Sequence, residues 1–314
     1  MNAETFAEWL RRQGYRVIRT PSSFWSEASN RVYQAFPYHW VINPSQDEII
    51  ELFKKTKLIA LRYSTSLASS SGQISYHVIY DKTSYPLSSL CKKARHDVTK
   101  GLLHASHEPI SLRRLAFDGW DLRYETLLRQ GRQHAETRAF WEKMCLSAEG
   151  LPGFESWGAI HNGELVSALL SFTLEDSVSV LYQQSKTDHL GFGVNNALIY
   201  EFTCNVLQRP EVCCIFYGLH SLDAPPGVDQ FKFRMGYTAK PVRQRVVFNP
   251  VFQPFINHFS LRLIQKMQKY WSGNYTLNKA EGMFRFYLSG KRKLYEQSWP
   301  EVLNEQRDVL LSQN

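Results

Sequence analysis

Apolar residues recur along the chain with two different spacings. Spacings of three and four residues bring side chains onto one face of a helix. They predict helices at residues 5–13, 46–55, 87–100, 134–148, 194–209 and 252–270. Alternating positions and short apolar runs predict strands at residues 15–19, 58–63, 74–80, 156–161, 165–174, 178–184, 212–219 and 242–248. The order of these elements predicts a mixed α/β fold of the α+β kind.

Cap and turn residues support several of these element ends. Ser45 followed by Glu48 is typical of a helix N-terminus, and Gly101 is expected to end the helix before it. Asn162-Gly163 predicts a two-residue hairpin turn between the first two strands of a meander.

The domain boundary is placed where the periodic pattern is weakest. Residues 105–121 show little periodicity and contain both a proline and a glycine. We therefore expect an N-terminal domain over residues 1–110 and a second domain over residues 120–290. The polar residues 291–314 are interpreted as a C-terminal tail without chemistry.

Composition and charge indicate a packed fold and a class of binding partner. Hydrophobic residues make up 43% of the chain and aromatic residues 14%, which is enough for sizeable packed cores. The formal net charge is +8. A basic balance favours an anionic partner, such as a nucleotide, a tRNA, a phospholipid or a cell-wall precursor.

Cysteine usage and hydropathy indicate a compartment. The five cysteines form no CxxC pair, and Cys213 and Cys214 should point to opposite faces of a strand. The N-terminal residues show no apolar leader, and about eighteen consecutive apolar residues, the length of a membrane span, occur nowhere. We expect a soluble cytoplasmic protein.

Two predicted helices allow more than one interpretation. Helix 87–100 has an apolar face and a basic face, and the basic face is either simply solvated or contacts an anion. Its basic residues are Lys92, Lys93, Arg95, His96 and Lys100. Helix 252–270 carries a wide apolar stripe, which normally packs in a core. Alternatively it covers an acyl-chain groove or lies at a membrane interface, because Arg262, Lys266 and Lys269 flank the stripe.

The most informative stretch covers residues 177–237. A strand leads into Gly191 and Gly193, and a helix, a second strand and the segment Phe231-Lys232-Phe233-Arg234-Met235-Gly236-Tyr237 follow. Glycines let the backbone expose its N–H groups at a helix N-terminus, which is a way to hold phosphates. This order resembles the acyl-CoA-binding core of the GNAT N-acyltransferase superfamily, and more closely its FemAB-like branch.

The resemblance implies a fold. FemAB-like chains contain two tandem GNAT-type units, so the first unit here would be a degenerate one. Each unit would have a mixed, mostly antiparallel sheet flanked by helices. In such folds the strands before and after the glycine-loop helix diverge and open a slot for the pantetheine arm.

Two positions depart from the usual superfamily pattern. The phosphate loop normally starts with Gln or Arg, and here Asp188 stands in that place. A tyrosine normally lies four residues before the final Gly-aromatic pair, and here that residue is Lys232. A Phe-Lys pair is the FemAB-like variant, in which the lysine offsets negative charge during acyl transfer.

The resemblance also implies a set of site residues. The main-chain N–H groups of Gly191, Phe192, Gly193 and Val194 would hold donor phosphates. Tyr182 and Gln183 would line the acyl-bearing end of the site. Lys232 would supply positive charge toward the oxyanion or a substrate phosphate.

The proton acceptor is sought at the end of strand 212–219, where Tyr217, His220 and Asp223 lie close together in sequence. His220 titrates in a useful range and is the first candidate, with Asp223 second. Alternatively, His220 has a structural role, or water is the base, as the resemblance to the superfamily implies. We expect no metal, because nothing completes a coordination set around His104 and His107.

Three functions remain open at this point. The first is an N-acyltransferase that uses acetyl-CoA or a longer acyl-CoA, with an amine acceptor that is anionic or attached to an anionic carrier. The second is a FemAB-like aminoacyl transferase that uses aminoacyl-tRNA and a cell-wall or peptide acceptor, favoured by Lys232, the net charge and Asp188. The third is a non-catalytic binding module on a GNAT fold. No membrane span is expected, although a peripheral membrane contact is compatible with helix 252–270.

Overall fold

A computed structural model describes residues 2–29, 31–132, 136–221, 227–271 and 274–312. The chain forms two compact units. Unit 1 contains Met1–Gln13, Val78–Gly218 and Pro225–Thr238, and unit 2 contains Gly14–His77, Leu219–Ala224 and Ala239–Asn314. Strands β5 (Gln73–Tyr80), β10 (Cys214–Leu219) and β11 (Thr238–Phe248) each pass from one unit to the other. The units therefore divide the chain differently from the predicted 1–110 and 120–290, because a boundary read from sequence assumes continuous segments.

The sheet of unit 1 contains the predicted meander. Its strands lie in the order β10-β9-β8-β7-β6. Their bounds are β6 Ser106–Ile110, β7 Phe154–His161, β8 Glu164–Leu174 and β9 Ser177–Ser185, beside β10. Strands β6 to β9 pair antiparallel, whereas β9 and β10 pair parallel. Asn162 and Gly163 have φ values of 51° and 83°, so the predicted hairpin turn is confirmed.

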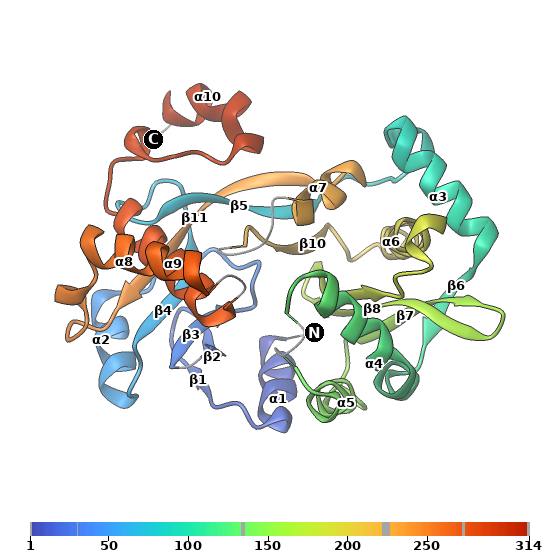
Figure 1. Ribbon diagram of the computed structural model, residues 1–314, viewed down its shortest axis with the longest axis horizontal. Coiled ribbons are helices and arrows are strands. Elements are labelled where there is room, and N and C mark those ends of the chain that lie inside the picture. Colours follow the sequence, from blue (N-terminus) through green and yellow to red (C-terminus); the bar gives the residue numbers. More distant parts are fainter. Residues whose placement is uncertain (1, 30, 133–135, 222–226, 272–273, 313–314) are drawn as a thin grey trace. The chain divides into compact units, whose positions relative to one another are not determined.

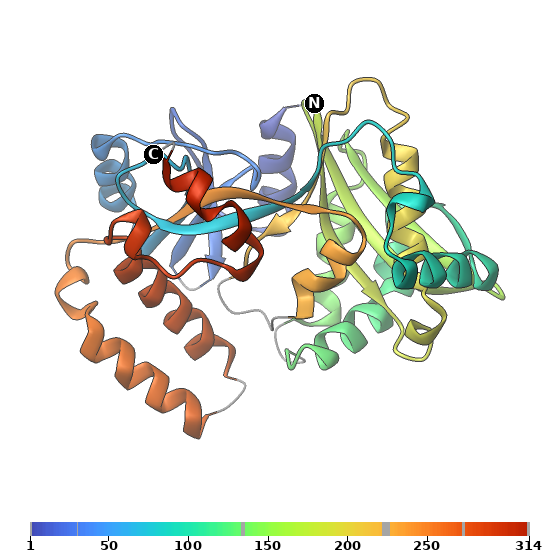
Figure 2. The same cartoon turned by 90° about the horizontal axis from the view of Figure 1, so that it is seen from above.

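Helices cover both faces of the unit 1 sheet (Figures 1 and 2). Helix α6 packs on β7, β8 and β9 with α3 against it, and α4 packs on the same strands together with α5 and α1. The bounds are α1 Ala3–Gln13, α3 Lys92–His104, α4 Leu112–Arg129, α5 Arg138–Ser147, α6 Val194–Val206 and α7 Gly227–Arg234, with 3-10 turns η1 Leu87–Ser89 and η2 Leu190–Phe192. Because α4 and α6 contact the same strands, they occupy opposite faces.

The strands of unit 2 follow the order β1-β2-β3-β4-β11, and their pairing is also mixed. Strands β3 and β4 pair parallel, whereas β1 with β2, β2 with β3 and β4 with β11 pair antiparallel. The bounds are β1 Val17–Arg19, β2 Phe24–Ser29, β3 Val32–Phe36, β4 Ala60–Thr65, α2 Gln46–Lys55, α8 His258–Tyr270, α9 Tyr275–Ser289 and α10 Arg307–Ser312, with 3-10 turns η3 Gln253–Phe255, η4 Leu294–Glu296 and η5 Glu301–Gln306. The predicted fold class, mostly antiparallel sheet flanked by helices, is confirmed.

Several predictions about elements were wrong. Residues 105–121, where little periodicity was found, contain β6 and the start of α4, and β2 and β3 were missed. Gly101 does not end its helix, since α3 continues to His104. A Cβ at residue 101 would lie 2.5 Å from the carbonyl oxygen of Gly193, so this glycine lets α6 approach α3.

Two segments of unit 2 also differ from expectation. The predicted polar tail packs on the unit, because Leu303 is buried and Gln297 Oε1 accepts a 2.7 Å hydrogen bond from the Ile74 amide. Helix α8 has no buried residue, so its interpretation as a core helix was wrong. Within the described residues, no helix has both the length and the apolar character needed to cross a membrane.

Candidate active site

The site lies where β9 and β10 separate. Their parallel pairing covers Cys214↔Ser177, Ile215↔Val178 and Phe216↔Ser179, and both strands continue beyond it. A cavity of about 440 Å³ follows directly, and all of its walls belong to unit 1. Its lining comprises Arg123, Thr126, Arg129, Gln130, Arg132, Val180, Leu181, Tyr182, Gln183, Gln184, Ser185, Leu190, Asn195, Tyr217, Phe231 and Lys232. The divergence that the family resemblance implied is therefore present, and it opens a cavity.

A hydrogen-bond chain crosses the cavity from β10 to α6. The Tyr217 hydroxyl donates to Oε1 of Gln183, and Nε2 of Gln183 donates to the Asn195 carbonyl oxygen at 3.1 Å. Burial raises the pKa of Tyr217 well above its usual value, with Tyr237 adding to the shift. Tyr217 is therefore a protonated phenol at neutral pH and serves as a hydrogen-bond donor.

Lys232 contributes an ammonium group to the same wall. Its Nζ lies 5.2 Å from the centroid of the Tyr217 ring and 2.9 Å from Oδ1 of Asp229. The two ion-paired side chains are each 14% exposed. A largely desolvated ammonium beside a phenol can stabilise negative charge that forms in the cavity. Sequence reasoning missed Asp229, although it lies one helical turn before Lys232.

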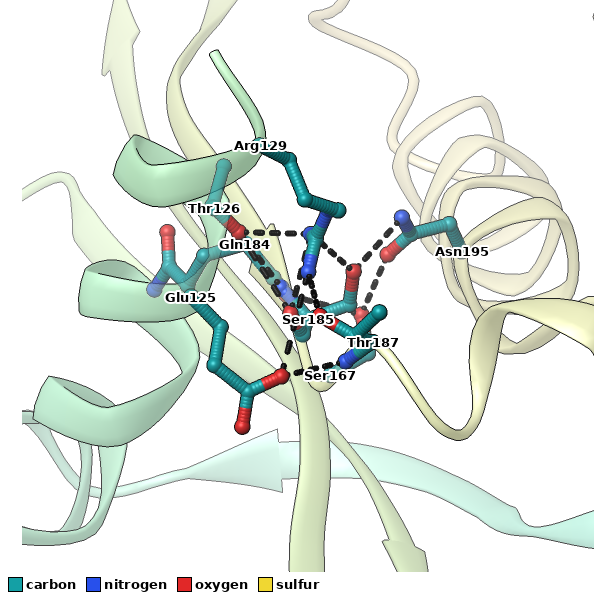
Figure 3. Close-up of polar contacts among 8 residues, drawn as sticks. All are labelled: Glu125, Thr126, Arg129, Ser167, Gln184, Ser185, Thr187 and Asn195. Atoms are coloured by element: carbon teal, nitrogen blue, oxygen red, sulfur yellow. Dashed lines mark hydrogen bonds and ion pairs between the residues drawn. The ribbon is translucent and has the colours of Figure 1, made fainter. Parts of the chain in front are cut away.

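The opposite wall comes from α4 (Figure 3). Nη2 of Arg129 donates to Oγ of Ser185 at 3.1 Å, and Nη1 donates to Oγ1 of Thr187 at 2.7 Å. Nδ2 of Asn195 reaches the same Ser185 hydroxyl from α6, at 2.9 Å. Ser185 thus joins helices from both faces of the sheet at the end of β9, and this holds the cavity rim in place.

A second arginine of α4 packs on the aromatic part of the cavity. Cζ of Arg123 lies 5.0 Å from the Tyr182 ring centroid and 5.8 Å from that of Trp141. Arg123 also forms an ion pair with Glu136, and both side chains are largely buried. This contact holds Tyr182, one of the predicted lining residues, in a fixed orientation.

Gln184 differs from the cavity residues described above, whose side chains form hydrogen bonds or ion pairs. Its side chain is 1% exposed, and within the described part of the chain neither Nε2 nor Oε1 has a hydrogen-bond partner. A buried amide without partners costs free energy, and such groups are rare in proteins. Gln184 is nevertheless among the residues that line the cavity.

The predicted phosphate loop forms the tight turn η2. The Phe192 amide donates to the His189 carbonyl oxygen at 3.1 Å, and the Gly193 amide donates to that of Leu190 at 3.0 Å. A phosphate would have to replace these two bonds. The Val194 side chain is in a core cluster. The assignment of Gly191, Phe192, Gly193 and Val194 to phosphate binding stays a prediction.

A cation stands beside this loop. Nζ of Lys100, on α3, donates to the Gly191 carbonyl oxygen at 2.8 Å and lies 5.1 Å from the Phe192 ring centroid. Lys100 belongs to the basic face for which an anion contact was one interpretation. It supplies positive charge at the loop whose leading residue, Asp188, is acidic.

Three histidines gather behind the same loop. His104 stacks on His161 at a centroid distance of 4.0 Å, and its Nε2 lies 2.9 Å from Nδ1 of His189. Desolvation lowers the pKa of His104, and the neighbouring His161 and His189 lower it further. Across the described ranges, no group of three or more His, Cys, Asp or Glu side chains has a metal-binding arrangement.

The remaining predicted catalytic residues lie elsewhere. His220 is in unit 2, where its ring stacks on Tyr76 at 4.5 Å and Nδ1 lies 3.2 Å from Oγ of Ser75. His220 is not among the described residues that line the cavity, and its role as proton acceptor stays a prediction. Asp223 lies outside the described residues.

The comparisons with known proteins come from structure alone, because no family model and no curated protein matches this sequence. The C-terminal domain of a protein assigned as a lysylphosphatidylglycerol synthetase from Agrobacterium fabrum is similar, with a TM-score of 0.53 and 10% identity over 79% of this chain and 88% of that chain. FemX is similar, with a TM-score of 0.50 and 10% identity over 79% of this chain and 92% of that chain. L-PGS from Bacillus licheniformis has a TM-score of 0.50 and 12% identity over 84% of this chain and 97% of that chain. The fold is therefore GNAT-like and of the FemAB type.

Proposed function

We propose that this chain is an N-acyltransferase that moves an acyl group from acyl-CoA to an amine. The observation that carries the proposal is the cavity between the diverging ends of β9 and β10, lined by Tyr217, Gln183 and Lys232. A slot between separated strands admits a long, narrow donor from one side and leaves the reacting carbonyl within reach of side chains. Polar side chains from α4, such as Arg129, and from α7, such as Lys232, both line this cavity.

The loop and α3 support acyl-CoA as the donor. Lys100 stands at the carbonyl of Gly191, beside the turn that precedes α6. An ammonium group at a helix N-terminus favours phosphate, because its charge adds to that of the helix dipole. The cation that the loop motif lacks at residue 188 is thus provided by a different element.

Lys232 and Tyr217 would carry the chemistry. The acceptor nitrogen attacks the acyl carbonyl carbon, a C–N bond forms, the C–S bond breaks, and the amine loses a proton while the thiolate gains one. Lys232 would stabilise the oxyanion. Tyr217, which burial keeps protonated, would donate a hydrogen bond to the leaving sulfur, and the proton that the amine loses would pass through water to the thiolate.

The acceptor is proposed to be anionic or attached to an anionic carrier. Arg129 and Arg132 line the cavity at the C-terminal end of α4 and just beyond it. Guanidinium groups bind carboxylates and phosphates in a bidentate way, so they favour such an acceptor. The Gln184 amide, which has no hydrogen-bond partner among the described residues, favours a peptide-like portion of the acceptor.

Aminoacyl transfer from tRNA is the second candidate. The Phe192 and Gly193 amides already donate within the turn, and an acidic Asp188 beside the loop would repel a pyrophosphate. The L-PGS and FemX neighbours share the fold. Lysyl transfer, which the name lysylphosphatidylglycerol synthetase indicates for the Agrobacterium fabrum neighbour, is aminoacyl chemistry that this cavity would also suit.

A binding experiment separates the candidates. Thermal unfolding is measured with acetyl-CoA, a longer acyl-CoA and an aminoacyl-tRNA. We expect acyl-CoA to raise the melting temperature of the wild type and Lys100→Gln to weaken that binding about tenfold at low salt. Lys93→Gln changes an exposed lysine of the same helix and should have little effect. A shift with aminoacyl-tRNA alone would select the second candidate, and no shift with either would refute both.

A further inference from the structure

Helix α8 turns an apolar face outward, toward solvent. The side chains of Phe259, Leu263 and Tyr270 are 78%, 51% and 75% exposed, and Phe255, just before the helix, is 68% exposed. Spacings of four and seven residues place the three helical side chains on one face. Isolated apolar residues are normal at a surface, but a row of them along one helix face is not.

The opposite face of α8 shows that the helix is held in place. Nε2 of Gln268 donates to Oδ1 of Asn278 on α9 at 2.9 Å, and Nε2 of Gln265 donates to Oε1 of Glu281 at 3.2 Å. Helix α9 in turn packs Met283 into the core of unit 2. Figure 2 shows α8 (orange) running beside α9 within this unit. The apolar face is therefore presented by an anchored helix.

Basic side chains border this face. Arg262, Lys266 and Lys269 are exposed and recur at spacings of four and three, so they form a stripe along the apolar row. No ion pair holds any of the three among the residues that the structure describes. Trp271, also exposed, follows the helix at its C-terminal end.

We propose that α8 docks this protein on the surface of a membrane that contains anionic lipids. Phe259, Leu263 and Tyr270 enter the boundary between headgroups and acyl chains, and the cationic stripe contacts lipid phosphates. An exposed aromatic and aliphatic row with unpaired cations beside it has the charge and polarity of such a surface. This inference does not depend on the proposed reaction.

Vesicle sedimentation tests the proposal with the full chain. The protein is expected to sediment with vesicles of phosphatidylcholine and phosphatidylglycerol, less with phosphatidylcholine alone, and less at high salt. The double variant Phe259→Ser/Leu263→Ser should lose at least about tenfold in affinity. Lys266→Gln should lose about fivefold on anionic vesicles and little on neutral ones.

A matched control is available in unit 1. Leu103, on α3, is 87% exposed, so Leu103→Ser removes an exposed apolar helix residue outside the proposed surface and should leave vesicle binding unchanged. Circular dichroism of each variant checks folding. A blue shift of Trp271 emission on anionic vesicles, found by difference against Trp271→Phe, would place the helix end in the interface.

Three results would overturn the proposal. One is no sedimentation of the wild type with anionic vesicles. The second is equal binding by the wild type and the Phe259→Ser/Leu263→Ser variant. The third is a wild-type dimer in light scattering that this variant converts to a monomer without any change in vesicle binding, because the face would then join two copies of the chain.

Discussion

Gly193 lies directly against the main-chain carbonyl of Asp97, and a Cβ at residue 193 would collide with that oxygen. Gly193 also has a φ of 75°, in the left-handed region that L side chains rarely adopt. The loop glycine is thus required for the packing of α3 on α6. Sequence reasoning assigned it to phosphate binding and missed this structural requirement.

The two loop glycines should therefore respond differently to alanine. Gly193→Ala is expected to lower the free energy of unfolding by roughly 2–4 kcal/mol, because the new Cβ is both strained and overpacked. Gly191→Ala should change it by no more than about 0.5 kcal/mol, since nothing lies within 4 Å of a Cβ there. Urea unfolding measures both. Equal effects would contradict the packing role of Gly193.

The sequence predicted the cavity residues that lie near the motif, and it missed those that arrive from elsewhere. Tyr182, Gln183, Tyr217 and Lys232 belong to one stretch whose element order was recognisable, and all four line the cavity. Arg129 reaches Ser185 across 56 residues of sequence, and no local pattern encodes such a contact.

The same limit explains the misjudged helix 252–270. Periodicity shows that apolar residues such as Phe259 and Leu263 share a face, but it does not show whether another element covers that face. In the structure α9 packs on the other side. The apolar pattern therefore predicts the helix, whereas the side on which α9 packs decides which side chains of α8 are exposed.

Lys232→Met tests the catalytic assignment of the ammonium group. Methionine keeps the apolar stem and removes the charge, so turnover should fall roughly a hundredfold, with a smaller change in donor affinity. The release of free thiol from acyl-CoA measures the rate once an amine acceptor is found, and calorimetry measures donor binding.

The partner of Lys232 provides the control. Lys232→Met removes the ion pair between Lys232 and the largely buried Asp229, which destabilises the fold for a reason unrelated to catalysis. The double variant Asp229→Asn/Lys232→Met relieves that charge. If the double variant recovers stability but remains slow, the rate loss belongs to the ammonium group; a near-normal rate would remove Lys232 from the mechanism.

Gln184 and its neighbour Gln183 form a matched pair for a stability test. Gln184→Met removes two unpartnered polar atoms from a buried position and should raise the free energy of unfolding by roughly 1 kcal/mol. Gln183→Met removes the hydrogen-bond partner of the Tyr217 hydroxyl and of the Asn195 carbonyl. This variant should lower the free energy of unfolding by about 1–3 kcal/mol.

The activity of the Gln184 variant then reports on the cavity. If a substrate supplies the missing hydrogen bonds, Gln184→Met should be more stable but bind the acceptor more weakly. A variant that is stabilised and binds the acceptor as well as the wild type would show that Gln184 does not contact substrate.

The buried His77 predicts how stability depends on pH. Desolvation, followed by the charges of His39 and Lys240, lowers the pKa of His77 to about 3, and its Nε2 lies 2.8 Å from Oγ of Ser64. In the unfolded chain the same group titrates near the usual value of about 6.5. Below that pH the unfolded state binds a proton that the folded state does not. The stability present above about pH 6.5 is therefore lost as the pH falls toward 3, by up to about 1.4 kcal/mol per pH unit.

Urea unfolding of the wild type and of His77→Gln between pH 7.5 and about 4.5 isolates this contribution. Glutamine does not titrate and its amide can still bond with the Ser64 hydroxyl, so the variant should lose stability less steeply over this range. Burial also lowers the pKa of His107, to about 4. Because His107 is present in both proteins, it contributes the same pH dependence of stability to each. The slopes of unfolding free energy against pH should therefore differ between the two proteins by the equivalent of about one proton between pH 6 and 4.5. Parallel curves would mean that His77 has the same proton affinity in the folded and unfolded chain, and that its burial on β5 does not exclude the charged form.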